Sequence, residues 1–285
     1  MAGPPPATLS EDHCMTANPH RQPAIFLPHG GGPCFFMDWT WGPADTWNAT
    51  QRFLAGLAAT LPEPPKALLV VSGHWEEPAF TASAAAQPQL IFDYSGFPEH
   101  TYRLTWPAPG HPELASRVQS LLAGAGLPAA VSPSRGYDHG VFVPLKVAFP
   151  QAQIPVVTLS LASSLDPAQH IAAGRALAPL RDEGVLIVAS GMSFHNLRAY
   201  HQPQTLDRAR AFNSWLTRAV ESPAPERDAL LINWHTAPHA AFSHPREEHL
   251  IPLMVVAGAG GNAPGTRIFT DEPMGAAISA FRFDG

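Results

Sequence analysis

Four short apolar runs constrain the fold of this chain more than any other feature of its sequence. They are rich in Val, Leu and Ile and lack the strict apolar/polar alternation of a half-exposed strand. The runs are Ala24–Leu27, Ala67–Val71, Ile154–Leu161 and Val185–Ala189. Such runs are typical of strands buried on both faces, as in parallel sheets covered by helices. We therefore expect them to form the middle of a sheet.

Segments with a helical spacing of apolar residues lie between these runs. The expected helices are Thr46–Leu61, Pro112–Ala123, Pro167–Leu180 and Leu206–Ser222. Asp166 suits the N-cap of the third helix, because Pro167 then occupies the first helical position, where a missing N–H is tolerated. The alternation of strand and helix predicts an α/β fold: a single domain with a central, mostly buried β-sheet flanked by helices on both faces.

Neither an internal repeat nor a low-complexity linker divides the chain, and 285 residues suit one large domain. Residues 1–22 contain three consecutive prolines and lack an apolar segment behind a basic start, so they do not resemble a secretory signal. We interpret 1–22 as a flexible N-terminal extension and 23–285 as the domain. The Pro-rich stretch Phe92–Pro112 has neither period and is long for a connection, which predicts a functional loop or lid.

Charge and cysteine content exclude several classes of function. The formal net charge is −6, and no run of Lys or Arg could neutralise a stretch of phosphates, so nucleic acid is not an expected partner. The apolar runs fall far below the roughly 20 residues that span a bilayer, so no membrane association is expected. Two cysteines cannot build a disulfide framework, which favours a cytoplasmic protein.

Three of the four apolar runs are followed at once by small residues and then by a histidine. These segments are Pro28-His29-Gly30, Ser72-Gly73-His74 and Ser190-Gly191-Met192-Ser193-Phe194-His195. Open α/β sheets bind ligands at the carboxyl ends of their strands, so His29, His74 and His195 are expected to converge on one crevice. A lone histidine is more often structural than functional, but no packing requirement accounts for three histidines in the same position relative to a strand.

A fourth candidate is His249. If a helix begins at Pro245, His249 shares its inward face with Leu253, whereas the glutamates before it turn away by about 100° per residue. His249 is therefore the better inward ligand, and a carboxylate of Glu247 or Glu248 stays an alternative. Histidine ligands with an open position also suit zinc. Non-haem Fe(II) oxygenases usually combine two histidines with one carboxylate.

His139 lies between glycines, in the segment Gly136-Tyr137-Asp138-His139-Gly140, which predicts a tight loop. Asp138 could orient a neighbouring imidazole there. We expect His139 to contact a substrate or to donate a proton. The aromatic residues Tyr94, Phe97 and Trp106 of the Pro-rich stretch are candidates for the wall of a site for a planar substrate, with packing in the core as the alternative.

The other histidines are expected to play minor roles. His235, His239 and His244 lie in a segment without strand or helix signals, and we interpret them as loop histidines that at most support the site. The remaining ones lie beside polar residues or prolines and are expected to be solvated: His13, His20, His100, His111, His170 and His201. The Gly30-Gly31-Gly32 run lacks the spacing of a dinucleotide or P-loop fingerprint, so a nucleotide cofactor is not indicated.

Together these motifs resemble the class III extradiol dioxygenases, specifically the DOPA-dioxygenase branch of the protocatechuate 4,5-dioxygenase superfamily. The similarity runs from about Pro23 to the C-terminus. The matching segments, in the family's order, are Pro28-His29-Gly30, Ser72-Gly73-His74-Trp75, Tyr94-Ser95-Gly96-Phe97-Pro98, Pro107-Ala108-Pro109-Gly110, Asp138-His139-Gly140, Gly191-Met192-Ser193-Phe194-His195-Asn196-Leu197 and Arg246-Glu247-Glu248-His249.

The resemblance implies that His29, His74 and His249 bind the metal and that His195 is the acid–base histidine beside it. In some members of the branch the residue matching His195 is itself a ligand, so both roles stay open. Fe(II) is the expected metal, with Zn²⁺ as the alternative. His139 is expected to assist catalysis and, with the aromatic residues of the Pro-rich stretch, to contact the substrate.

The activity implied by the resemblance is the cleavage of a catechol ring with O₂ to a muconic semialdehyde. A catechol and O₂ are thus the expected small-molecule partners. His195 would supply the proton that ring opening needs, and a general acid of this kind contributes roughly 10²- to 10⁴-fold. Two alternatives stay open: a zinc-dependent hydrolase or lyase on the same scaffold, and a non-catalytic binding protein that kept the fold.

Overall fold

The computed structural model describes residues 20–285, so most of the extension predicted over residues 1–22 lies outside the described part. Gln22 is already buried. Its backbone N–H donates to the Arg181 carbonyl oxygen at 3.1 Å, and its side-chain amide donates to the Glu63 carbonyl oxygen at 3.0 Å. Contacts with the body of the domain therefore begin no later than residue 22.

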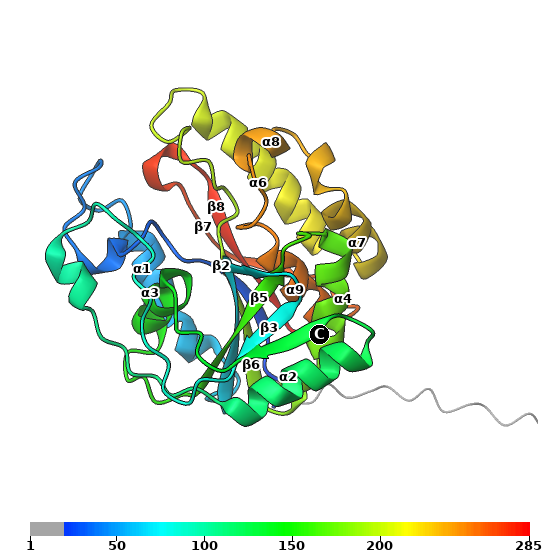
Figure 1. Ribbon diagram of the computed structural model, residues 1–285. Helices are drawn as coiled ribbons and strands as arrows, with labels where there is room; N and C mark the ends of the chain where they lie inside the picture. Colours follow the sequence, from blue (N-terminus) through cyan, green and yellow to red (C-terminus); the bar gives the residue numbers. More distant parts are fainter. Residues whose placement is uncertain (1–19) are drawn as a thin grey trace, which may run out of the picture.

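An eight-stranded sheet forms the centre of the molecule, in the order β4-β3-β5-β2-β6-β1-β8-β7 (Figure 1). The four apolar runs form β1 (Ala24–Pro28), β2 (Ala67–Glu77), β5 (Val156–Ala162) and β6 (Val185–Gly191). These strands are neighbours and pair in parallel. The prediction that the apolar runs make the middle of the sheet is thus confirmed.

Four further strands, not predicted from the apolar runs, complete the two sides of the sheet. They are β3 (Phe80–Ser83), β4 (Ala129–Ser132), β7 (Thr266–Asp271) and β8 (Ile278–Phe283). Strand β3 pairs antiparallel with β5, and β8 pairs antiparallel with β1. The sheet is therefore mixed, with a parallel centre.

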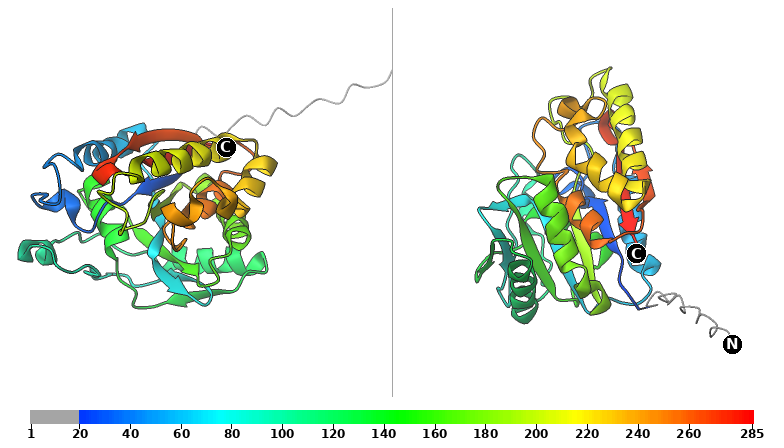
Figure 2. Two further views of the ribbon diagram at one scale, coloured as in Figure 1. Left: turned by 90° about the horizontal axis from the view of Figure 1, so that it is seen from above. Right: turned by 90° about the vertical axis from the view of Figure 1, so that its right-hand side faces the viewer.

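Helices cover both faces of the sheet, as predicted (Figure 2). One face carries α2 (Pro112–Gly124), α4 (Pro167–Leu177), α6 (Thr205–Glu221), α7 (Ala224–Ile232) and α9 (Pro252–Ala259). The other face carries α1 (Asn48–Gly56) and α3 (His139–Ala148). In β1, Phe26 belongs to the first core and Ile25 and Leu27 to the second, because successive side chains of a strand point to opposite faces.

Short elements complete the chain: η1 (Cys34–Phe36), η2 (Leu57–Thr60), η3 (Glu99–Arg103), α5 (Pro179–Asp182), η4 (Trp234–Thr236), α8 (Ala240–Ser243) and η5 (Pro273–Gly275). The helix expected over 167–180 divides before Pro179, whose ring does not fit a helix interior. Asp166 caps it as expected, accepting the Ala168 backbone N–H at 2.8 Å.

His170 is not solvated, contrary to the expectation from its neighbours. It is fully buried on α4. Its Nδ1 donates to the Asp166 carbonyl oxygen at 2.7 Å, and its Nε2 accepts the Ala162 backbone N–H at 3.2 Å. Burial lowers its pKa to about 4. The neutral ring thus joins the start of α4 to the end of β5, and its role is structural.

The segment expected to form a tight loop around His139 is the start of helix α3. Pro144 lies inside this helix and cannot donate to the carbonyl group of Gly140 four residues before it. That carbonyl instead accepts the hydroxyl of Ser190 from β6. A proline that disfavours a helix in the sequence is therefore accommodated by a bond to the sheet.

The Phe92–Pro112 stretch contains η3 and one isolated bridge at Gly110, and otherwise has no regular structure before α2 begins. Among residues 20–285, none of the helices combines the length and the apolar composition that crossing a bilayer would require. The cytoplasmic location stays a prediction.

Candidate metal centre and substrate cavity

Strands β2, β6 and β1 lie side by side, and this order brings their histidines to one edge of the sheet. His29 directly follows β1, and its backbone N–H donates to the carbonyl oxygen of Gly191 at the end of β6 at 3.2 Å. His74 lies inside β2, where the pairing with β5 shifts register between Val71 and Glu76. A strand irregularity of this kind redirects side chains, and here it brings His74 toward His29.

The backbone around His249 lies so close to the ends of β2 and β6 that two positions there must be glycine. A Cβ atom on Gly191 would lie 2.2 Å from the His249 carbonyl oxygen, and one on Gly73 would lie 3.0 Å from the Glu248 carbonyl oxygen. The Met192 backbone N–H donates to the His249 carbonyl oxygen at 3.0 Å. Residues 248 and 249 are thus held against the ends of β2 and β6.

His249 does not lie on a helix, contrary to the expectation of a helix from Pro245. Helix α9 begins at Pro252, and His249 lies in the turn before it. Proline is favoured in the first helical turn, where its missing N–H breaks no helical bond. The side chain of His249 still points inward and is 3% exposed.

The Nε2 atoms of His29, His74 and His249 meet at one point. His74 Nε2 lies 3.3 Å from His29 Nε2 and 3.2 Å from His249 Nε2. A metal ion bound through nitrogen at about 2.1 Å places neighbouring ligand atoms about 3.0 to 3.4 Å apart in octahedral or tetrahedral geometry. These two distances, with all three ligand atoms within 4.8 Å of one another, therefore fit a single ion.

Hydrogen bonds fix which nitrogen carries the proton in two of these rings. His29 Nδ1 lies 2.9 Å from the Gly30 carbonyl oxygen, which can only accept, so Nδ1 donates. His249 Nδ1 lies 2.8 Å from Glu248 Oε1 and donates to that carboxylate. Both arrangements leave the Nε2 lone pair directed at the common point, as a metal ligand requires.

The electrostatics favour neutral rings in this cluster. Burial, with the nearby imidazoles, holds the pKa values of His29 and His249 well below the usual value. Burial and the neighbouring His139 lower the pKa of His74 to about 3. Imidazole binds metals in its neutral form, so the three rings are ready to act as ligands at neutral pH.

Two carboxylates that sequence reasoning did not place in these roles support the histidines. Asp93 Oδ1 accepts the backbone N–H of His139 at 2.9 Å and its Nδ1 at 2.8 Å, and Asp93 Oδ2 lies 3.7 Å from His74 Nδ1. Burial alone would raise the pKa of Asp93, but the bonds from His139 lower it to about 2. Asp138, expected to orient an imidazole, instead binds Ser72 and Arg135.

Glu248 is the second of these carboxylates. The sequence suggests it only as an alternative ligand, but its Oε1 faces the Nδ1 atoms of His249 and of His195, the latter at 3.2 Å. Burial opposes ionisation, yet the hydrogen bond with His195 holds the pKa of Glu248 below its usual value. The carboxylate therefore orients two imidazoles at once.

His195 and His139 lie on different sides of the three converging rings. The ring of His195 stacks on that of His249, with centroids 3.4 Å apart and planes 17° apart. The ring of His139 lies 4.0 Å from that of His74, between centroids. Neither belongs to the group formed by His29, His74 and His249. Two overlapping groups could also hold an ion: His139 with His74 and Asp93, and His195 with Glu248 and His249.

Of the three loop histidines, only His244 is buried. Its Nε2 donates to the Ser193 carbonyl oxygen at 3.1 Å, and burial lowers its pKa to about 3. It thus holds the segment that leads to His195. His235 and His239 are exposed.

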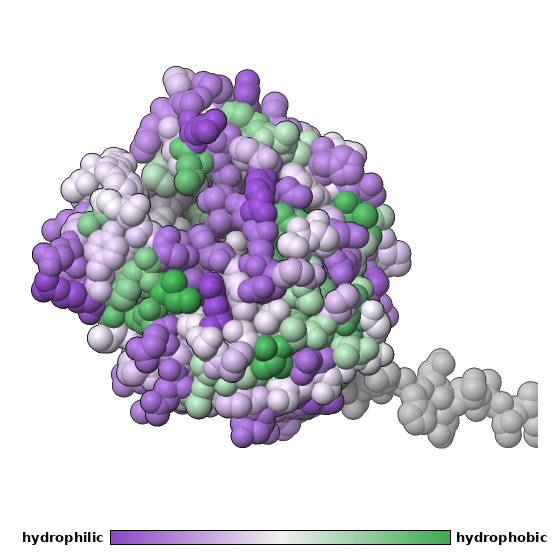
Figure 3. Space-filling model, viewed as in Figure 1, coloured by the Kyte–Doolittle hydropathy of each residue, from purple (hydrophilic) through white to green (hydrophobic). Residues whose placement is uncertain are grey.

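A cavity of about 480 Å³ is lined by the histidines of this site, which are His29, His74, His139, His195 and His249. Its walls are mainly aromatic and include Trp39, Trp41, Trp47, Tyr94, Phe97 and Tyr200. Figure 3 shows the surface hollowed near its upper left, between the N-terminal part of the chain and the segment after β6. An apolar cavity with a few convergent polar groups is the usual form of a small-molecule site.

Three of the four expected substrate contacts line this cavity: His139, Tyr94 and Phe97. Trp106 does not. It is 3% exposed, packs against Tyr137, and its Nε1 donates to the Phe149 carbonyl oxygen at 3.0 Å. We therefore place Trp106 in the core under the Pro-rich stretch.

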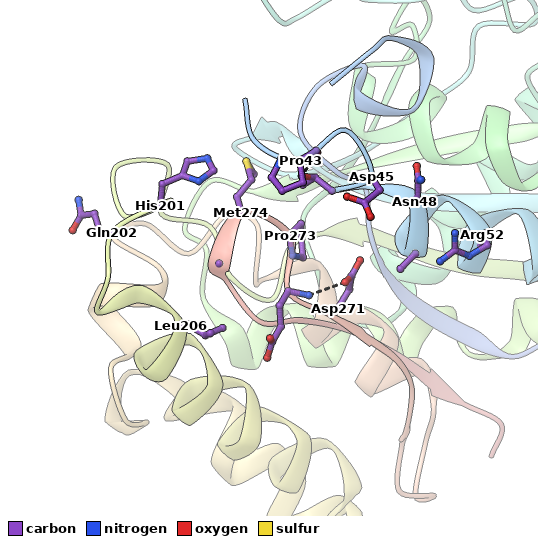
Figure 4. A pocket seen from close by; sticks show the side chains of 14 residues that line it. Pro43, Asp45, Asn48, Arg52, His201, Gln202, Leu206, Asp271, Pro273 and Met274 are labelled. Atoms are coloured by element: carbon purple, nitrogen blue, oxygen red, sulfur yellow. Dashed lines mark hydrogen bonds between the residues drawn. The ribbon is translucent and has the colours of Figure 1, made fainter. Parts of the chain in front are cut away.

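A second pocket of about 580 Å³ adjoins this cavity and is more polar. His201 and Met274 line both, and the His201 backbone N–H donates to the Met274 carbonyl oxygen at 3.2 Å. Figure 4 shows these two residues at one end of the second pocket and Arg52 at the other. None of the residues that line it belongs to the converging histidines, so it is not the candidate centre.

Comparison with known proteins identifies the family. Residues 23–282 match the family described as the catalytic LigB subunit of aromatic ring-opening dioxygenase. The chain belongs to this family. The resemblance inferred from the sequence motifs is thus confirmed, and dioxygenases of the LigB family depend on a non-haem metal.

Curated relatives of this LigB-family protein come from fungi, plants and bacteria. Dioxygenase tasH of Hapsidospora irregularis is 37% identical over 92% of this chain and 86% of its own. The 4,5-DOPA dioxygenase extradiol of Beta vulgaris is 42% identical over 69% of this chain and 74% of its own. That of Escherichia coli K12 is 37% identical over 88% and 89%.

A solved structure has the same fold. The crystal structure of an uncharacterized protein from Escherichia coli K12 aligns with a TM-score of 0.75 and 32% sequence identity, covering 92% of this chain and 100% of that chain. The described part of the LigB-family protein therefore accounts for the whole of that relative.

Proposed function

We propose that this LigB-family protein is an extradiol dioxygenase that uses Fe(II) to cleave the ring of a catechol with O₂, giving a muconic semialdehyde. The observation that carries the proposal is the meeting of three Nε2 atoms, from His29, His74 and His249, at the end of an aromatic cavity. A three-histidine centre leaves coordination positions for a bidentate catechol and for O₂.

When bound, Fe(II) would bring the two catechol oxygens and O₂ together and allow electrons to pass between them. The protein's part is to position the ring and to move protons. Tyr94 and Phe97, whose ring centroids lie 5.4 Å apart at a T-shaped angle, form a wall against which a planar ring can pack.

His139 is suited to receive a proton from the catechol. Its Nδ1 donates to Asp93 at 2.8 Å, so the opposite nitrogen, Nε2, is free to accept. The ionised Asp93 carboxylate stabilises the imidazolium that would form, the same logic by which a carboxylate supports histidine in other acid–base pairs.

His195 is suited to deliver a proton during ring opening. Its Nδ1 faces Glu248 and its ring stacks on that of His249, so the ring is held from two sides. Its backbone N–H donates to the Ser243 carbonyl oxygen at 2.9 Å. Its side chain is 21% exposed and lines the cavity, where Nε2 can reach a substrate oxygen.

A zinc-dependent hydrolase or lyase is the second candidate, favoured by the same observation, since three neutral histidines also suit Zn²⁺. Family membership weighs against it, and the converging ligand nitrogens weigh against a non-catalytic binding protein.

The test is reconstitution of the metal-free full chain under nitrogen with Fe(II) or with Zn²⁺, followed by a catechol and air. The iron form is expected to consume one O₂ per catechol and to give a yellow product, and the zinc form is expected to do neither. An iron form that consumes no O₂ with any catechol would reject the proposal.

A further inference from the structure

The cavity has room for more than a catechol ring. Its volume is about 480 Å³, within the range of pockets that hold drug-sized ligands. A bare catechol of eight non-hydrogen atoms would leave much of this volume to water. The side chains that line the cavity farther from His29, His74 and His249 therefore indicate which substituent the catechol ring carries.

Exposed apolar side chains gather at this cavity. Among residues 20–285, the large apolar side chains that are exposed are Trp41, Leu197 and Ile232, at 49%, 70% and 37%. Trp41 and Leu197 both line the cavity, although they come from segments far apart in the sequence. Large apolar side chains left in water at one place mark a surface that a ligand covers.

The aromatic wall continues from this rim toward the histidines. Trp41 contacts Phe97, with ring centroids 5.1 Å apart, and contacts Trp39 with centroids 5.0 Å apart. The indole nitrogens of Trp39 and Trp47 are themselves buried, so these residues present ring carbon to the cavity. The Tyr94 hydroxyl is already bound to the Thr101 carbonyl oxygen at 2.7 Å.

Charged partners are missing from the walls. Among residues 20–285, no Lys, Arg, Asp or Glu lines the cavity, and its polar side chains are histidines, tyrosines and tryptophans. Charged side chains line two neighbouring pockets instead. Arg52 and Asp45 line the second pocket, on the other side of His201 and Met274. In Figure 4, Arg52 stands at the end of that pocket farthest from these two residues.

A third pocket shares His195 and Leu197 with the cavity. It is lined by Arg198, Arg246 and Glu248, of which Arg246 is already paired with Glu76.

From this chemistry we propose that the substrate is a catechol with an uncharged, apolar alkyl or aryl substituent, which packs between Trp41, Phe97 and Leu197. The inference rests on the proposed function. An α-amino acid substituent, as in DOPA, would place an ammonium and a carboxylate group against this apolar rim, where no oppositely charged side chain lines the cavity, and charge held against apolar surface loses hydration without a compensating partner. This protein is thus expected to differ in substrate preference from its relatives named 4,5-DOPA dioxygenase.

The experiment compares three substrates with the iron-reconstituted full chain: catechol, 4-tert-butylcatechol and L-DOPA. We expect kcat/KM for 4-tert-butylcatechol to exceed that for L-DOPA by about 10-fold or more, which corresponds to about 1.4 kcal/mol. Leu197→Ser and Trp41→Ala are expected to lower the ratio of kcat/KM for 4-tert-butylcatechol over catechol by about 10-fold, since the substituent loses its apolar contacts. Ile232→Ala, an exposed apolar residue of α7 outside the cavity, is the matched control and should change nothing.

A second readout needs no turnover. Under nitrogen, 4-tert-butylcatechol is expected to quench the tryptophan fluorescence of the metal-free protein at lower concentration than L-DOPA, and Leu197→Ser should weaken this binding. L-DOPA cleaved as efficiently as 4-tert-butylcatechol would overturn the inference and leave the proposed function standing. Iron-loaded protein that cleaves none of the three would overturn both.

Discussion

Two carboxylates flank the converging histidines, and they differ in whether they hydrogen-bond one of the three rings that point at the common centre. Glu248 is adjacent in sequence to His249, and its Oε1 accepts a hydrogen bond from the Nδ1 atom of that ring at 2.8 Å. Asp93 bonds His139, which is not among the three converging rings, at 2.8 Å, and lies 3.7 Å from the metal-directed His74. In the proposed function, Glu248 therefore orients a metal ligand, His249, together with His195, whereas Asp93 mainly orients His139.

The largest effect on iron binding is expected from removing one of the proposed ligand histidines, because neither Glu248 nor Asp93 can replace it. His29→Ala and His74→Ala should each abolish stoichiometric iron, because a three-ligand centre does not hold its ion with one ligand missing. Iron content after anaerobic reconstitution and gel filtration measures this, with the exposed His235→Gln as the control. A full equivalent of iron in either alanine variant would contradict the ligand assignment.

His195 tests the acid–base side of the comparison. His195→Gln should keep near-normal iron content and lose turnover by roughly 10²-fold or more, the usual contribution of a general acid–base group. If His195 is itself a ligand, the variant should lose its iron before kinetics can be measured. Full iron with full turnover would argue against both roles.

The two carboxylate variants compare the pairs directly. Glu248→Gln removes the negative acceptor of the His249 Nδ1 proton and should weaken iron affinity by about 10-fold or more, the usual effect of losing such a partner. Asp93→Asn should leave iron affinity within about threefold of wild type, because the Asp93 carboxylate lies 3.7 Å from His74 Nδ1, beyond hydrogen-bond distance, and should lower kcat by about 10-fold through His139. Metal titrations separate the two variants, whereas kcat is expected to fall in both, because Glu248 also faces His195. Unchanged iron affinity in Glu248→Gln, or its loss in Asp93→Asn, would contradict the comparison.

Substitution of His170 is expected to have the smallest effect on activity, because this residue is buried away from both carboxylate–histidine pairs. Its pKa of about 4 lies below the 6.5 of an exposed histidine, so between these values the unfolded chain binds a proton that the folded chain does not. His170 therefore contributes about 3 kcal/mol to the free energy of unfolding. This contribution is intact above about pH 6.5 and is lost as the pH falls to about 4.

His170→Gln should therefore reduce the loss of unfolding free energy between pH 6.5 and 4.5. Urea unfolding of the metal-free protein at several pH values measures the slope, and His235→Gln controls for the general effect of a histidine change. An unchanged slope would show that His170 does not titrate as its burial implies.

The sequence predicted the parallel centre of the sheet and the convergence of His29, His74 and His195 on one cavity, because buried strands are local features. It did not predict that β2 continues to Glu77, so that His74 lies inside this strand rather than after it. It missed Asp93, because nothing in the Pro-rich stretch ties that carboxylate to His139, 46 residues later. The turn that carries His249 was also missed, because prolines at both 245 and 252 suit a helix start and only the packing decides between them.

Helix α3 was missed for a related reason. Pro144 disfavours a helix locally, and only the hydroxyl of Ser190, from a distant strand, satisfies the carbonyl group that the proline leaves free. Strands β3 and β4 have four residues each, too few for a period to stand out.

Gly73 and Gly191 act as spacers that set how near the His249 segment can come to the sheet. They offer no ligand atom themselves, yet a Cβ atom at Gly191 would lie 2.2 Å from the His249 carbonyl oxygen, so an added methyl group would push the backbone of this proposed ligand away from the sheet. In a search of genomes for similar centres, a chain that keeps all three histidines but carries larger residues at these two positions should not be counted as having the same site. Two glycines, which have no side chain, are thus part of the sequence pattern that identifies such a site.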